Sequence, residues 1–273
     1  MLATQFGAFV TALTLKGETV DEITGLATVM RAKAIPVSVS GPVIDTCGTG
    51  GDNSYSFNIS TAAAFVAAGA GLKVAKHGNR AMSSHCGSAD VLEALGVKID
   101  LGADSVARCL EEIGIGFMLA PKYHPAMKYA TAPRREIGIR TVFNILGPLT
   151  NPARAEAQVM GVPSRELGEK IALVLHRLGT KHALVVHGAD GMDEISITGK
   201  SIVWEVTPRG PLPPYEVSPQ LFGFRTASLT DIAGGTPQDN AQILRRIFEG
   251  ERSPRRNIVT MNAAAVIVAG NRA

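Results

Sequence analysis

Residues 43–90 read VIDTCGTGGDNSYSFNISTAAAFVAAGAGLKVAKHGNRAMSSHCGSAD, and this stretch decides the fold. It holds two successive units, each an apolar strand, a loop of small and polar residues, and a helix. In the first unit, Val43 and Ile44 end a strand that breaks at residues 48–52 (GTGGD), where glycine permits close approaches denied to other residues. Asn58 stands where a helix N-cap belongs, so a helix should begin there with free N–H groups directed at the glycine loop. A helix N-terminus beside such a loop favours anion binding.

The second unit repeats this arrangement. Residues 72–75 are strand-like, residues 76–80 (KHGNR) add two cations and an amide, and Ser88 leads into an apolar helix. Ligands of open α/β sheets bind at the carboxyl ends of the strands, so both loops should face one crevice. Two anion-binding loops in one crevice suggest a ligand with two phosphate groups. The alternative is that the glycines only form turns and the Ser and Asn residues only cap helices.

Two common nucleotide motifs are absent. The first loop contains no Gly-x-x-x-x-Gly-Lys-Ser/Thr sequence, and Asn53 stands where a dinucleotide fingerprint requires its third glycine. Nucleoside triphosphate hydrolysis and NAD binding therefore lose support.

The remaining elements follow from apolar spacing. They are expected as helices over residues 19–31, 127–140 and 262–269 and as strands over residues 95–100, 159–162 and 183–186.

Several blocks, in order along nearly the whole chain, resemble the signature blocks of the anthranilate phosphoribosyltransferases of tryptophan synthesis. These blocks are residues 48–52 (GTGGD), 58–61 (NIST), 76–80 (KHGNR), 87–90 (GSAD), 134–141 (RREIGIRT), 144–152 (NILGPLTNP) and the pair Asp193 and Glu194.

The resemblance implies an α/β fold: a small, incomplete helical lobe and a larger α/β domain with a central, mostly parallel sheet flanked by helices. Residues 1–38 would form the lobe, joined in space by roughly residues 122–142, and residues 39–273 the phosphoribosyltransferase domain. By the same comparison, further helices would precede Met1 and further residues would follow Ala273, so the chain is expected to be shortened at both ends. A homodimer through the helical lobe is also implied.

The implied reaction transfers the phosphoribosyl group of phosphoribosyl pyrophosphate (PRPP) to anthranilate with Mg²⁺, with two ions expected. No acid or base catalyst is assigned, because a neutral aromatic amine is already a nucleophile. Donor-binding residues implied by the matched blocks are Gly48, Gly51, Asp52, Ser56, Asn58, Ile59, Ser60, Thr61, Lys76, Ser83, Ser84 and Ser88. Anthranilate-binding residues are Gly48, His77, Asn79, His124, Arg134 and Pro148, and metal ligands are Ser60, Asp193 and Glu194.

Residue chemistry agrees with these roles but leaves alternatives open. The guanidinium of Arg134 can donate two parallel hydrogen bonds to a carboxylate, although arginines on one helix usually form a solvated face. Asp193 and Glu194 follow a strand and can reach the crevice, where Mg²⁺ prefers carboxylates together with substrate phosphates, although adjacent loop acids are usually just solvated. His77 and His124 could be structural histidines.

Composition limits the classes of function. The chain has 273 residues, of which 45% are hydrophobic, with 27 Lys and Arg against 24 Asp and Glu. A formal net charge of +3 argues against a dedicated nucleic-acid protein. Three cysteines without a CxxC pair suit reduced thiols. No signal peptide opens the chain and no apolar run reaches the ~18 residues of a membrane span, so a cytoplasmic protein without membrane contact is expected.

Two other functions compete with the transferase. A pyrimidine-nucleoside phosphorylase-like enzyme would share the fold group but need a nucleobase pocket, whereas the blocks at residues 134–141 and 144–152 favour an aromatic carboxylate. A non-catalytic, nucleic-acid-binding relative would need a strongly basic surface and loss of the acidic pair at residues 193–194, which this chain retains.

Overall fold

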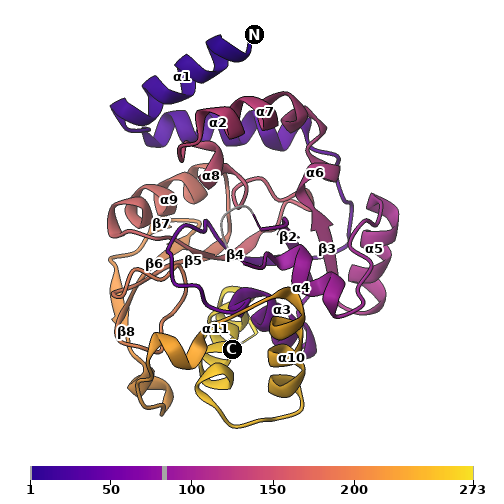
Figure 1. Ribbon diagram of the computed structural model, residues 1–273, viewed down its shortest axis with the longest axis vertical. Helices are drawn as coiled ribbons and strands as arrows, with labels where there is room; N and C mark the ends of the chain where they lie inside the picture. The colour runs from indigo at the N-terminus through magenta and orange to yellow at the C-terminus, as the bar shows by residue number, and fades with distance from the viewer. Residues whose placement is uncertain (1, 82–84, 273) are drawn as a thin grey trace.

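A single sheet organises the computed structural model, which describes residues 2–81 and 85–272. Its strand order is β3-β2-β1-β4-β5-β6-β7, with β8 paired to β6 (Figure 1). The strands are β1 Ile44–Gly48, β2 Val74–Gly78, β3 Ile115–Leu119, β4 Ala157–Gly161, β5 His182–Gly188, β6 Ser201–Thr207, β7 Gly210–Pro211 and β8 Tyr215–Val217.

Strands β3, β2, β1, β4 and β5 run parallel, and β6 is antiparallel to β5. A parallel sheet is stable in water only when helices cover both of its faces. Strand β4 shows this burial, because all of its residues are buried while Val159 and Met160 enter two different hydrophobic clusters. The expected central, mostly parallel sheet flanked by helices is confirmed.

Helices surround the sheet (Figure 1). They are α1 Ala3–Lys16, α2 Val20–Lys33, α3 Ile59–Gly69, α4 Ser88–Ala94, α5 Ala103–Glu112, α6 Ala120–Tyr123, α7 Lys128–Ile137, α8 Phe143–Leu146, α9 Arg165–Arg177, α10 Pro237–Phe248 and α11 Pro254–Ala269, with 3₁₀ turns at Pro125–Met127, Pro219–Phe222 and Leu229–Ile232. Within the described part of the chain, no helix combines the length and apolar character needed to cross a membrane.

Each face of the sheet has its own helical cover. Ala64 of α3 and Met261 of α11 share a hydrophobic cluster with strand residues of one face, and α10 joins them. Ile171 of α9 and Ala27 of α2 belong to a second cluster with the other face, which includes Trp204 of β6. Helices α3 and α11 therefore cover the face of the sheet that includes Ile44 of β1.

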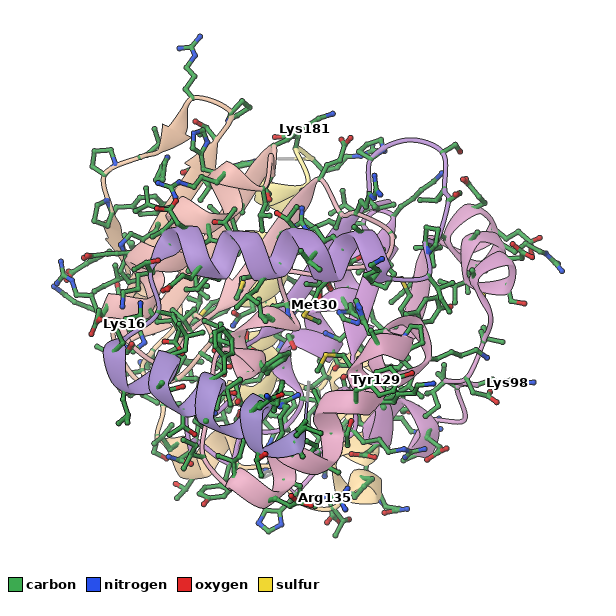
Figure 2. The ribbon with its side chains drawn as sticks, turned by 90° about the horizontal axis from the view of Figure 1, so that it is seen from above. Lys16, Met30, Lys98, Tyr129, Arg135 and Lys181 are labelled. Atoms are coloured by element: carbon green, nitrogen blue, oxygen red, sulfur yellow. The ribbon has the colours of Figure 1, made fainter. Side chains whose placement is uncertain are left out.

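The N-terminal helices form a small lobe above the sheet. Thr19 and Glu22 build a capping box that starts α2, and Phe6 of α1 lies 5.4 Å from Phe143, measured between ring centroids. Helix α1 packs against α7, and α2 packs against α8 and α9. Figure 2 looks onto this lobe from above, with the exposed Lys16 and Tyr129 marking α1 and α7.

Three expectations about elements are wrong. Residues 95–100 form no strand, because Leu95 ends α4 and Gly96 turns the chain with a φ of +89°. Val43 and Ile44 do not end a strand; β1 begins at Ile44 and runs into the glycine loop. The last helix begins eight residues before Asn262, at Pro254, because Ser253 accepts a capping hydrogen bond from the N–H of Arg256.

The order of the strands places the site. From β1 the chain proceeds to β2 and β3 on one side, and then returns to β4 on the other side of β1. Such a reversal opens a crevice at the carboxyl ends of the two central strands. Those ends are Gly48 and Gly161, which face each other in register.

Candidate functional site

The first glycine loop wraps around a carboxylate from a distant strand end. Gly50 and Gly51 have φ values of +68° and +82°, which L side chains rarely adopt. The N–H of Gly50 donates to Asp193 Oδ2 at 2.7 Å, so the loop that follows β5 is joined to the loop that follows β1. A Cβ at Gly48 would lie 2.7 Å from Asp193 Cγ, and one at Gly161 would lie 3.1 Å from Asp193 Cα. Glycine at both strand ends therefore makes room for Asp193.

The surroundings of Asp193 disfavour the charged form of its carboxyl group. Burial and the neighbouring carboxylate of Asp52 raise the pKa of Asp193 to about 7. Both causes act by disfavouring the charged form. A cation beside this carboxylate would restore its charge.

The side chain of Glu194 lies against the start of α3, close to Ser60 and Lys76. Its Oε1 accepts a hydrogen bond from the Ser60 N–H at 3.1 Å. Lys76 Nζ lies 3.4 Å from Ser60 Oγ and donates to Thr46 O at 2.6 Å. Burial and the charge of Asp193 raise the pKa of Glu194 well above its ordinary value, while Lys76 opposes that shift. The structure thus brings Ser60, Lys76 and the acidic pair together.

Asn58 precedes α3 as expected, but it does not cap the helix with its side chain. Its amide Nδ2 donates to Cys86 O at 3.0 Å, and its Oδ1 accepts from Asn240 Nδ2 at 2.9 Å. The N–H of Ser60 is not free either, because it donates to Glu194. The expectation of a side-chain cap with free N–H groups is wrong in this respect: a carboxylate already occupies the helix N-terminus.

Other predicted donor residues follow the same two loops. Gly51 and Asp52 lie in the glycine loop, Ser56 forms an isolated β-bridge with Ala233, and Ile59 and Thr61 are buried in the first turn of α3. Thr61 Oγ1 is buried without a hydrogen-bond partner among the described atoms. Ser83 and Ser84 lie outside the described residues.

The second loop places Ser88 beside the end of β2. Ser88 Oγ donates to Asn79 O at 3.3 Å, and Asn79 is exposed with its Oδ1 accepting from the Arg80 N–H. A Cβ at Gly78 would lie 2.9 Å from the ring of Phe117. A side chain at position 78 would therefore push this loop away from the sheet.

Two buried histidines, His77 at the end of β2 and His124 after α6, lie against each other. The rings of His77 and His124 lie 5.0 Å apart between centroids, and His77 Nδ1 lies 3.2 Å from Gly147 O. Burial first, and then His124, lower the pKa of His77 to about 3, so it is neutral at physiological pH. The Nε2 atoms of both rings are buried with no partner among the described atoms.

Pro148 and Arg134 approach from the lobe side. Pro148 O accepts a hydrogen bond from Gln158 Nε2 at 2.8 Å. Arg134, on α7, is half-buried with its guanidinium 5.4 Å from the ring centroid of Phe143, and burial lowers its pKa. Within the described residues, Arg134 forms no side-chain hydrogen bond to the glycine loop. The structure therefore does not bring Arg134 and this loop together.

Two charged residues beside the site carry no assigned role in the sequence interpretation. Arg140 Nη2 donates to Gly50 O at 2.8 Å and lies over Gly51. Asp45 is fully buried beneath the loop, where Asn151 Nδ2 donates to it at 2.7 Å, and burial raises its pKa to about 6. An acidic residue three positions before the glycine loop was a readable signal for Asp45. Arg140 belonged to the same arginine-rich stretch as Arg134, and nothing local distinguished them.

The residues of this corner fit a magnesium ion that binds together with a phosphate. Among residues 2–81 and 85–272, no group of three or more His, Cys, Asp or Glu side chains is arranged as a metal site. Mg²⁺, however, is usually held by one or two carboxylates, with water and substrate phosphates completing its shell. The pKa values of Asp193 and Glu194 are raised, so their negative charges are not fully compensated, although Lys76 partly offsets the charge of Glu194.

Family models match both parts of the chain. The glycosyl transferase family α/β domain matches residues 40–273, and the helical bundle domain of the same family matches residues 3–34.

Named relatives agree. The chain is 60% identical over 268 residues to an anthranilate phosphoribosyltransferase of Chloroflexus aggregans, covering 98% of this chain and 79% of that protein. The fold is similar to anthranilate phosphoribosyltransferase of Thermus thermophilus, with a TM-score of 0.94 at 43% identity, covering 100% of this chain and 82% of that one. It is also similar to the Saccharomyces cerevisiae enzyme in complex with PRPP and Mg, with a TM-score of 0.91 at 31% identity, covering 98% and 76%.

Proposed function

This chain belongs to the anthranilate phosphoribosyltransferases, and from that premise we propose how its crevice performs the reaction of the family. The enzyme transfers the phosphoribosyl group of PRPP to the amino nitrogen of anthranilate and releases pyrophosphate. The names of the relatives favour this reaction over a nucleoside phosphorylase or a nucleic-acid-binding protein.

In this reaction the bond from ribose C1 to the pyrophosphate oxygen breaks and a C1–N bond forms. The amino group loses one proton, which leaves to solvent or pyrophosphate. Negative charge grows on the leaving group while the ribose ring becomes positive, so stabilisation of the leaving phosphates is the main catalytic demand.

The donor phosphates meet the two loops in this proposal. Lys76 offers a buried ammonium 3.4 Å from the Ser60 hydroxyl, and the glycine loop offers backbone that can lie close to a ligand. The proposed donor contacts are Gly48, Gly51, Asp52, Ser56, Asn58, Ile59, Ser60, Thr61, Lys76 and Ser88, with Ser83 and Ser84 from the segment outside the described residues.

Magnesium belongs with this donor site. Bound Mg²⁺ neutralises charge on the departing pyrophosphate. We place one ion near Ser60 and Glu194 at the start of α3 and a second near Asp193 at the glycine loop. Two ion positions are supported because the carboxylates bind different backbone groups: Glu194 accepts from the Ser60 N–H and Asp193 accepts from the Gly50 N–H.

The acceptor lies toward the lobe in this proposal. Arg134 would face the anthranilate carboxylate, since a guanidinium can donate two parallel hydrogen bonds to it. Gly48, His77, Asn79, His124 and Pro148 would line the rest of the site. The neutral His77 keeps positive charge away from the amino group, which must itself stay neutral to attack.

The observation that carries the donor and metal assignment is the meeting of Lys76, Ser60 and Glu194 at the N-terminus of α3. The test is loss of anthranilate fluorescence on adding PRPP and Mg²⁺, with an EDTA control. Metal-dependent consumption supports the assignment, and no turnover by folded protein contradicts it. Arg134→Ala should raise the KM for anthranilate and leave the KM for PRPP nearly unchanged; equal effects on both would remove Arg134 from the acceptor site.

We also propose a cytoplasmic homodimer formed through the lobe of residues 1–38, joined by residues 122–142. Helix α1 and its N-cap residue expose three large apolar side chains: Leu2, Phe9 and Leu15 are 69%, 52% and 83% exposed. Sedimentation equilibrium of the wild type and Phe9→Glu tests this: a dimer that the substitution dissociates supports it, and a wild-type monomer contradicts it.

A further inference from the structure

A short backbone segment, Ile232 to Gly235, lies alongside the loop that leads into α3. We call it the strap. The Phe57 N–H donates to Ile232 O at 3.2 Å, the Gly234 N–H donates to Tyr55 O at 2.9 Å, and Ser56 bridges Ala233 in antiparallel fashion. A Cβ at Gly234 would lie 2.9 Å from Phe57 Cα, so the two backbones touch. The strap therefore fixes the path of residues 55–57, which lead into α3.

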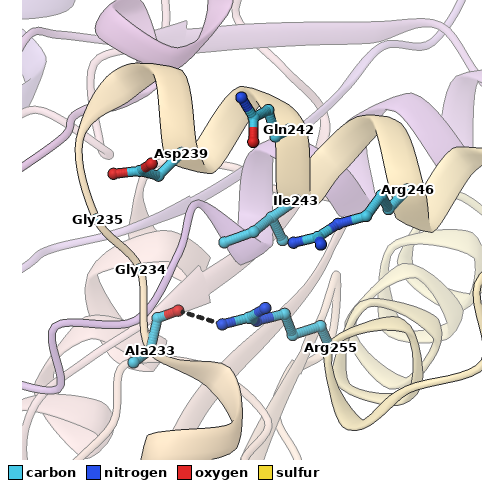
Figure 3. A pocket seen from close by; sticks show the side chains of 8 residues that line it. All are labelled: Ala233, Gly234, Gly235, Asp239, Gln242, Ile243, Arg246 and Arg255. Carbon is cyan, nitrogen blue, oxygen red and sulfur yellow. Dashed lines mark hydrogen bonds between the residues drawn. The ribbon is translucent and has the colours of Figure 1, made fainter.

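The strap is in turn held by the last two helices. Arg255 of α11 donates from Nη2 to Ala233 O at 3.0 Å, as Figure 3 shows, beside a cavity of about 220 Å³. From α10, Asn240 Oδ1 accepts a hydrogen bond from the Gly235 N–H at 2.8 Å. The strap is thus anchored from both helices.

Asn240 also reaches past the strap. Its Nδ2 donates to Asn58 Oδ1 at 2.9 Å, and Asn58 Nδ2 donates to Cys86 O at 3.0 Å. Asn240 is 1% exposed. In both Asn240 and Asn58, the side-chain oxygen accepts and the nitrogen donates. These hydrogen bonds run from the Gly235 N–H to Cys86 O, and they fix which way each amide is turned.

We propose that Asn240 is a positioning residue for the phosphoribosyl donor: its amide links the strap to Asn58 at the N-terminus of α3, and through Asn58 to the backbone of Cys86 just before α4. Asn240 touches no reacting atom. It sets the distance between the start of α3 and the residues that lead into α4, and this role rests on the donor site proposed above. A misplacement of about 1 Å in such a site is enough to cost substantial activity.

Three variants separate this role from general stability. Asn240→Asp keeps the volume and the acceptor for the Gly235 N–H, but it cannot donate to Asn58 and places a negative charge against its oxygen. Asn240→Ala removes both bonds. Gln242→Ala is the matched control, since Gln242 is an exposed amide two residues along the same helix.

The first measurement is PRPP binding by calorimetry with Mg²⁺ and without anthranilate, followed by the KM for each substrate. We expect Asn240→Asp to weaken donor binding by about tenfold or more, as a lost buried hydrogen bond with an unpaired acceptor does. The KM for anthranilate should stay within about twofold of wild type, because only donor binding is perturbed. Adding Asn240→Ala to Asn58→Ala should cost little beyond Asn58→Ala alone, since Asn240 acts on the donor site through Asn58.

The proposal is overturned if Asn240→Asp binds PRPP as tightly as Gln242→Ala, or if the two KM values rise together with a fall in melting temperature. Additive effects of the Asn58 and Asn240 changes would also overturn it. A failure of the proposed function is visible separately, because wild-type protein would then bind PRPP without consuming anthranilate.

Discussion

Replacing Gly48 by alanine should inactivate the enzyme through a displaced carboxylate rather than through unfolding. A Cβ at this position would lie 2.7 Å from Asp193 Cγ and closer still to Asp193 Oδ2. Non-bonded carbon atoms reach their best separation near ~3.5 to 4.0 Å, so the carboxyl group must retreat by about 1 Å. Backbone on the far side leaves little room, because Gly161 packs against the main chain of Asp193.

Two consequences follow from this displacement. Asp193 would lose the hydrogen bond from the Gly50 N–H, now 2.7 Å, which contributes about 1.5 to 3 kcal/mol at a pH above the pKa of about 7, where the carboxylate is charged. The unfolding free energy should fall by about that amount. The loss of kcat should be larger, on the order of 100-fold, because a metal ligand moves by about 1 Å relative to the donor.

The assay is kcat as a function of Mg²⁺ concentration, followed by anthranilate fluorescence, together with urea denaturation of the same protein. Gly50→Ala is the control for backbone strain in the same loop. Its φ is +68°, but a Cβ there meets nothing within 4 Å, so it should cost about 1 kcal/mol of stability and much less activity.

Wild-type kcat and Mg²⁺ dependence in Gly48→Ala would refute this reasoning. They would mean that the reaction does not need the Asp193 carboxylate at the place where the glycine loop holds it. A loss of activity no greater than that of Gly50→Ala would also contradict it, since strain alone would then explain both.

Three further perturbations test other parts of the site. Lys76→Met, which keeps a long apolar stem in a nearly fully buried position, should raise the KM for PRPP by about 10-fold or more in steady-state assays, because a charged phosphate contact is lost; an unchanged KM would remove Lys76 from the donor site. Asp193→Asn with Glu194→Gln should abolish Mg²⁺-dependent turnover and leave the circular dichroism spectrum unchanged, and retained turnover would exclude both carboxylates from the mechanism. His77, with its pKa lowered from 6.5 to about 3, stays neutral when folded but takes up a proton when unfolded, so its contribution to stability is present above pH 6.5 and is lost as pH falls toward 3. Between pH 8 and pH 5, protonation of His77 in the unfolded chain lowers the free energy of unfolding by about 2 kcal/mol. In urea titrations this free energy should therefore fall by about 2 kcal/mol less in His77→Gln than in the wild type over the same pH range. Equal falls in the two proteins would contradict the assignment.

The two strand-loop-helix units could be predicted because their signals are local. Glycines, polar residues and an Ala-rich run follow one another within a few positions, and the structure places β1, α3, β2 and α4 there. Residues 95–100 misled the same reasoning, since an apolar run reads alike in a strand and in an extended connection. What distinguishes them is a neighbouring strand to pair with, which a local pattern does not contain.

Partners across the chain could not be predicted in this way. Arg140 contacts Gly50 across 90 residues, and Asn240 contacts Asn58 across 182. Neither Arg140, which follows α7, nor Asn240 on α10 carries a local mark of which distant group it will meet. The resemblance to a family supplied Asp193 and Glu194, whereas the residues that hold their surroundings in place became visible only from the folded contacts.

The metal-side loop is fixed from far downstream in the chain. Asn262 on α11 is buried, and it both accepts from the Ile195 N–H at 2.9 Å and donates to Ile195 O at 2.9 Å, directly after the acidic pair. During synthesis on the ribosome, all residues that touch substrate in our proposal have emerged long before Asn262 has. A nascent chain halted before α11 would therefore carry every proposed ligand of the donor but would lack the two Asn262 hydrogen bonds to Ile195. Emergence of α11 from the exit tunnel is therefore required before Asn262 can hold the loop that carries Asp193 and Glu194.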